Sequence, residues 1–88
     1  MLDRERLYSL SESDNYKDRF LAEYIQLKDR YNKLHRMLIK WEAGTLNFKT
    51  TCPFGILEKQ ALLMGQYLKQ LEIRAEIEDI DLEREELK

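Results

Sequence analysis

The 88-residue sequence has one cysteine, one histidine, one proline and three glycines, and each shortage excludes a class of structure or site. A single cysteine rules out an intrachain disulfide and a cysteine-based metal cluster, and it is compatible with a reducing cytosol. With His35 alone, a histidine-based metal site or a nucleophile–histidine triad lacks its usual parts. So few prolines and glycines, together with 36% charged residues, favour long helices over short strands joined by turns.

The chain also lacks a long apolar run and an excess of positive charge. Its first residues, Met1 to Arg6, contain no apolar signal core, and no stretch approaches the length of a membrane span. The formal net charge is −2, whereas general binding of nucleic acids or of a membrane surface requires a basic stripe. We therefore expect a soluble intracellular protein that binds neither DNA, RNA nor membranes.

What the sequence does contain is a heptad pattern of bulky apolar residues in its first half. The members of this pattern step by four and three positions without interruption: Phe20, Tyr24, Leu27, Tyr31, Leu34, Leu38 and Trp41. The spacing predicts a helix over residues 14–43 with one apolar side, and Gly44 supplies a C-terminal stop. Ser13 is the expected N-cap of this helix, and the arm before it, residues 1–13, is expected to hold a short helix.

A second apolar heptad pattern follows a connection of residues 44–53. Because Pro53 is favoured at the first position of a helix, we expect the next helix over residues 54–86. The second pattern comprises Leu57, Ala61, Met64, Leu68, Leu71 and Ala75. The connection is long enough for the chain to reverse, and Leu46 and Phe48 are expected to tuck against the end of the reversal. The predicted fold class is all-α: a short N-terminal helix followed by a long antiparallel helical hairpin, in a single domain spanning the chain.

The second helix has more apolar surface than one partner helix covers. Its apolar residues outside the heptad pattern include Leu62, Leu63, Tyr67, Ile73, Ile77 and Ile80. A helix that is apolar over so much of its circumference is normally buried on more than one side. We therefore expect the chain to assemble as a homo-oligomer. Gly65, inside this helix, indicates the close approach of another helix.

In the first half of the chain, tyrosines alternate with lysines and arginines, a combination that can bind a ligand with bases and phosphates. Aromatic rings offer stacking faces to bases, while Lys and Arg offer charge to phosphates. Tyr24 and Tyr31 belong to the first heptad pattern, so they are interpreted as core residues. Tyr8 and Tyr16 flank the hinge after the arm, and together with Lys17 they are candidates for closing over a small anionic ligand.

Two longer patterns carry a resemblance to a known family. The first helix reads L-x-x-R-x-x-K-L from Leu27 to Leu34, and the second reads Q-x-x-x-M-x-x-Y-x-x-x-L-x-x-R from Gln60 to Arg74. Together they resemble the hairpin domain shared by the phage anti-CBASS cyclic-oligonucleotide sponges and the Thoeris anti-defence sponges. The resemblance spans about residues 16–77, and the chain length and N-terminal arm favour the anti-CBASS branch.

The resemblance implies a non-enzymatic protein that sequesters cyclic dinucleotide second messengers, such as cyclic GMP-AMP, without cleaving them. In some members of the family, cyclic trinucleotides bind at a separate site. It also implies suppression of CBASS signalling in the cytoplasm of an infected bacterial host, and a homohexamer that holds dinucleotides between protomers. Neither a cofactor nor a metal is expected.

The resemblance also suggests particular residues. The family's dinucleotide pocket uses a tyrosine from the arm and a lysine from the first long helix, for which Tyr8 and either Lys17 or Lys28 are candidates, alongside Tyr16. Arg74 matches a family arginine and is the candidate for a second nucleotide site, with a salt bridge between protomers as the alternative. A different class of function stays open: a helical scaffold or adaptor that binds a partner protein through the exposed face of its second helix.

Overall fold

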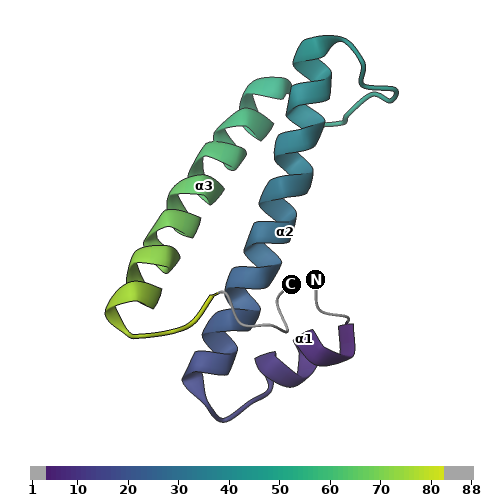
Figure 1. Ribbon diagram of the computed structural model, residues 1–88. Helices are drawn as coiled ribbons and strands as arrows, with labels where there is room; N and C mark the ends of the chain where they lie inside the picture. The colour runs from purple at the N-terminus through teal and green to yellow at the C-terminus, as the bar shows by residue number, and fades with distance from the viewer. Residues whose placement is uncertain (1–3, 83–88) are drawn as a thin grey trace.

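The structure is a computed structural model that describes residues 4–82 (Figure 1). Within that range the chain forms three α-helices and no strands: α1 (Arg4–Ser11), α2 (Tyr16–Ala43) and α3 (Phe54–Ile77). The predicted all-helical class, with one short helix followed by two long ones, is confirmed. None of the helices in this range is both long and apolar enough to cross a membrane.

The start of α2 is set by Asn15 and not by Ser13, which the sequence suggested as the N-cap. Asn15 Oδ1 accepts a hydrogen bond from the Lys17 amide at 2.9 Å, satisfying one of the free donors of the first turn. The Ser13 hydroxyl supports this turn, since it accepts from the Asn15 amide at 3.1 Å and donates to Asp18 at 2.9 Å. Tyr16 and Lys17 therefore occupy the first turn of α2.

The helices α2 and α3 lie side by side, and the chain runs in opposite directions along them (Figure 1). At one end, the rings of Trp41 and Phe54 meet edge to face with centroids 5.2 Å apart. Toward the other end, the Tyr24 hydroxyl donates to Glu72 at 2.8 Å. The buried core cluster comprises Phe20, Leu21, Tyr24, Leu68, Leu71, Ala75 and Ile80. Most of these residues belong to the two heptad patterns, so the patterns identify the faces that pack together.

The first half of α2 is covered on a second side by α1 (Figure 1). Phe20, Leu21 and Ala22 are consecutive and all buried. Successive residues of a helix point about 100° apart, so no single neighbouring helix covers all three. Leu10 of α1 is also buried. Apolar packing against α2 thus stabilises the short helix α1, because a helix of this length is not stable by itself.

Gly44 ends α2 as the sequence predicts. Its φ of 78° lies in the left-handed region, which glycine adopts without the steric penalty of a Cβ atom. The Gly44 amide donates to the Trp41 carbonyl at 3.0 Å, and the Thr45 amide donates to the Lys40 carbonyl at 2.8 Å. This pair of bonds is the Schellman arrangement, which satisfies the last free carbonyls of a helix.

The end of α3 differs from the expectation: the helix stops at Ile77, well short of residue 86. Asp79 has a φ of 56°, and the Ile80 amide donates back to the Ala75 carbonyl at 2.8 Å. This turn brings Ile80 into the core cluster, where only 7% of its surface stays exposed. Burial of that side chain favours the turn over a continued helix. The last positions of the expected helix lie outside the described residues.

The structure contradicts the expectation for Phe48 and confirms the close approach expected at Gly65. Phe48 does not tuck against the end of the helix pair, because 55% of its surface is exposed, although Leu46 is half-buried. At Gly65, a Cβ atom would lie 3.4 Å from Cε1 of Tyr31. The close approach expected at this glycine therefore comes from the Tyr31 ring of α2.

The turn after α3 predicts different effects for two isoleucines three residues apart. Ile80→Ala removes a buried side chain and is expected to lower the free energy of unfolding by about 2–5 kcal/mol. Ile77→Ala removes the same group from a position that is 78% exposed within the single chain, so a change within about 0.5 kcal/mol is expected for unfolding of the dissociated chain. Urea denaturation of both variants at one protein concentration measures the difference. Equal losses of unfolding free energy in the two variants would contradict the turn that buries Ile80.

Candidate functional site

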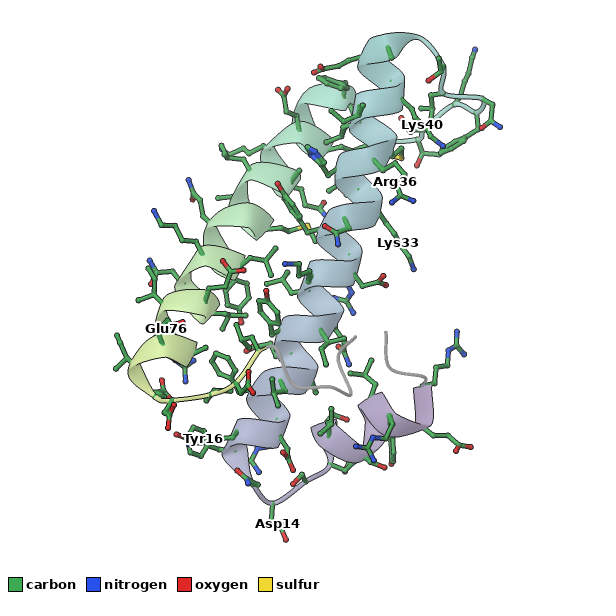
Figure 2. All side chains as sticks on the ribbon, viewed as in Figure 1. Asp14, Tyr16, Lys33, Arg36, Lys40 and Glu76 are labelled. Atoms are coloured by element: carbon green, nitrogen blue, oxygen red, sulfur yellow. The ribbon has the colours of Figure 1, made fainter. Side chains whose placement is uncertain are left out.

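Three of the five predicted site residues lie at one end of the α2–α3 pair. Tyr16 and Lys17 are in the first turn of α2, and Arg74 is in the last turn of α3. Figure 2 shows Tyr16 beside the end of α3, where its side chain interacts with the Glu78 carboxylate. Lys17 Nζ donates to the Asp79 carbonyl at 3.4 Å. The start of α2 is thus tied to the turn that ends α3.

Arg74 is positioned by contacts within its own chain. Its Nε donates to Glu78 Oε2 at 2.8 Å, and its guanidinium carbon lies 4.9 Å from the centroid of the Phe20 ring. The hydrogen bond raises the pKa of Arg74 and lowers the pKa of the Glu78 carboxyl group. Among the described residues, no side chain accepts a hydrogen bond from the two terminal guanidinium nitrogens. These nitrogens remain available to a phosphate or carboxylate ligand.

The same flank of the molecule continues with a tyrosine–glutamate pair. The Tyr67 hydroxyl donates to Glu23 Oε2 at 2.5 Å and so links α3 to α2. This bond to a carboxylate raises the pKa of Tyr67. The flank presents the faces of Tyr16 and Tyr67 and the free N–H groups of Arg74, which is chemistry suited to bases and phosphates. Two carboxylates, Glu23 and Glu78, offset its positive charge.

Lys28 lies away from these residues. It follows Glu23 by five positions on α2, so it points about 140° away around the helix. Lys28 Nζ donates to the Tyr24 hydroxyl at 3.2 Å and lies 5.5 Å from the centroid of that ring. Burial raises the pKa of Tyr24, and its hydrogen bond to Glu72 raises it further. Lys28, Tyr24 and Glu72 line a groove of about 580 Å³ that runs along the end of α3.

This groove carries more acid than base. Besides Lys28, its charged lining consists of Glu72, Glu76, Asp79 and Asp81, and Figure 2 shows Glu76 near the end of α3. A ligand with two phosphates would meet several like charges there, which disfavours binding. The carboxylates do not form a metal site either: within residues 4–82, no cluster of three or more His, Cys, Asp or Glu side chains could hold a metal ion.

Tyr8 also lies apart from the other candidates. It is on α1 with 67% of its surface exposed, and its carbonyl accepts a hydrogen bond from Ser11 Oγ at 2.8 Å. In the described part of the chain, its ring and hydroxyl form no hydrogen bond or ring contact with Tyr16, Lys17 or Lys28. Within residues 4–82, the structure therefore does not join Tyr8 to Lys17.

The sequence reasoning missed a row of cations on the outer face of α2. Lys33, Arg36 and Lys40 follow one another at positions i, i+3 and i+7, which places them on one side of the helix. Figure 2 shows all three on the side of α2 away from α3. Lys33 pairs with Asp29 at 3.0 Å, while Arg36 and Lys40 are exposed. The spacing was visible in the sequence, but such cations usually mark only a solvated helix face.

These features describe a small all-helical protein with a cluster of tyrosines and cations where α2 begins and α3 ends. The family model named Sequestin matches residues 14–77, and the chain belongs to the Sequestin family. The match covers α2, the loop after it and α3, and it leaves out α1. A search of curated proteins found no match, and a search of solved structures found none either.

The Arg74–Glu78 pair predicts a pH effect that can be measured at one residue. Arg74→Gln is expected to raise the pKa of Glu78 toward the ordinary glutamate value of about 4.3, because the guanidinium that favours the carboxylate is removed. In the wild type, the pair stabilises the fold above that ordinary pKa, and the contribution is lost as pH falls through the lowered one. Carboxyl ¹³C shifts followed by NMR measure the pKa. Lys33→Gln, which breaks the i,i+4 pair with Asp29, is the control and should leave the pKa of Glu78 unchanged.

Proposed function

We propose that this member of the Sequestin family binds and sequesters cyclic dinucleotides such as cyclic GMP-AMP, and cyclic trinucleotides at a second site, without cleaving them. By lowering the free concentration of these messengers, the protein would suppress CBASS signalling in the cytoplasm of an infected bacterium. The observation that carries the proposal is the family match over residues 14–77, since the family's name indicates that a ligand is sequestered.

The cluster at the end of the helix pair supports a nucleotide as that ligand. Tyr16 and Tyr67 offer ring faces for bases, and Lys17 and Arg74 offer N–H donors for phosphates. A cyclic dinucleotide carries about two negative charges, which a few cations neutralise. Sequestration requires binding alone, so the role we propose is not enzymatic and uses neither a cofactor nor a metal.

We further propose that the two long helices act as a hairpin that assembles into a homo-oligomer, with the hexamer implied by the resemblance. The exposed large apolar residues of α3 are Ile56, Leu62, Leu63, Tyr67, Ile73 and Ile77. An exposed apolar face of this size indicates an interface. Assembly also helps the ligand site, because cations from a second chain would offset the carboxylates Glu23 and Glu78.

A direct test is calorimetry with a panel of cyclic di- and trinucleotides. We expect saturable binding of at least one of them. Heating the complex should then release the ligand chemically intact, as checked by liquid chromatography. Linear dinucleotides of the same bases serve as the control. Cleaved product after incubation would contradict a sponge, and absence of binding to every cyclic nucleotide would refute the proposed ligand class.

The exposed face of α3 also favours a second candidate function, that of a scaffold or adaptor for a partner protein. A shallow groove of about 400 Å³ on this face is lined by Ile56, Lys59, Gln60, Leu63, Met64 and Tyr67. An amphipathic helix of another protein would fit such a surface.

Mass in solution separates the two functions. A sponge is expected to form a closed assembly of several chains, and Leu63→Glu should dissociate it by placing a charge in the apolar interface. Lys59→Glu, at the rim of the same groove, is the control and should leave the assembly intact. Light scattering coupled to size exclusion measures the mass. A monomeric wild type would favour the scaffold.

A further inference from the structure

A cavity lies at the end of the helix pair opposite the cluster of Tyr16, Lys17 and Arg74, where the loop connects α2 to α3. It has a volume of about 570 Å³. Its lining includes Trp41 from the end of α2 and the loop residues Phe48, Lys49, Thr50 and Thr51. This cavity is separate from the cluster of Tyr16, Lys17 and Arg74.

Two aromatic rings with different freedom line this cavity. Trp41 is held by its edge-to-face contact with Phe54, at an interplanar angle of 73°. Phe48 is more than half exposed and has no ring partner among the described residues. An exposed phenylalanine in a loop beside a fixed tryptophan leaves apolar ring surface open to a flat ligand. Stacking of this kind accepts any nucleobase, because every base has a π-face.

The backbone of the loop has unused hydrogen-bonding capacity. Residues 46–52 form no backbone-to-backbone hydrogen bond with any described residue. The bond made inside this segment runs from Thr50 Oγ1 to the Cys52 carbonyl at 2.8 Å. Amide N–H and carbonyl groups of the loop are therefore available to the edge of a planar ligand. Nucleobases carry donors and acceptors on their edges that such groups can pair with.

The charged side chain in the lining of the loop cavity is basic, whereas most of those that line the groove at the other end are acidic. The lining of the loop cavity contains Lys49 and no acidic side chain. Lys40 precedes Trp41 and lies one helical turn before Gly44, two residues that line the cavity. Arg36 lies a further turn back, and Figure 2 shows Arg36 and Lys40 on the side of α2 from which the loop projects. A phosphate in this cavity would therefore meet Lys49 and no carboxylate of the lining.

We propose that the loop cavity is a separate nucleotide-binding site. A base stacks on Phe48 and Trp41 with its edge against the loop backbone, and its phosphate lies toward Lys49, Lys40 and Arg36. This inference rests on the proposed sequestering function, and it names a place on the chain where a nucleotide is held. It assigns a role to the loop and to the outer face of α2, which the cluster at the other end does not use.

Trp41 provides the test, because it is the chain's single tryptophan and lines the cavity. Cyclic GMP-AMP, titrated into the full chain, is expected to quench Trp41 fluorescence in a saturable way. If calorimetry detects no binding of cyclic GMP-AMP, the titration uses a cyclic nucleotide for which calorimetry does detect binding. Calorimetric binding without a fluorescence change would overturn the loop site and leave the proposed function standing. No heat and no quenching with any cyclic nucleotide would overturn both.

Matched variants separate this site from the one at the start of α2. Phe48→Ala is expected to weaken the quenching-detected affinity about 5- to 150-fold, as lost base stacking does, and Phe48→Tyr should restore it. Lys49→Gln should weaken the quenching-detected affinity at low salt, whereas Lys69→Gln on α3 should leave that affinity unchanged. Lys17→Ala should leave the quenching unchanged. Quenching that survives Phe48→Ala but disappears in Lys17→Ala would overturn the proposal. Circular dichroism checks that each variant keeps its helices.

Discussion

The apolar contact between α2 and α3 is the constraint on which the other features of the structure depend. Each well-buried leucine, such as Leu21 or Leu71, contributes about 1.5–3 kcal/mol when it leaves water. The contact also sets the register of the two helices, which brings Tyr24 opposite Glu72. One consequence is that α2 begins where α3 ends, so Tyr16 and Arg74 share a flank. Another is that the loop and its cavity lie at the far end.

The sequence predicts most of the fold because periodicity and capping are local signals. The step of four and three residues identifies the packed faces of α2 and α3, and Gly44 marks the end of α2. The predicted end of α3 was wrong for a physical reason: Ile80 follows Ile77 at the helical spacing of three positions, and the same residue satisfies a turn that returns it to the core. Asp79 tolerates the left-handed conformation, so nothing in the residue types separates the two outcomes.

The candidate site is harder to predict because it depends on which side of a helix each residue occupies and on what faces it. Tyr16 and Lys17 follow from the position of the first turn. Lys28 is near them in sequence, yet it belongs to an acidic groove on another side of α2. The pairing of Arg74 with Glu78 is visible as an i,i+4 spacing. The carboxylates that α3 and its turn bring to the same end become apparent only in three dimensions.

Charged and apolar side chains are distributed differently over the outer faces of α2 and α3. Acidic side chains gather at the end of α3, while Arg36 and Lys40 lie on the outside of α2 near the loop. The helix α3, whose exposed apolar residues include Leu62 and Ile73, lies on the other side of α2 from those cations (Figure 2). Chains that associate through α3 would therefore bury apolar surface without covering the cations or the loop. In such an assembly, an anionic ligand would reach the outer face of α2.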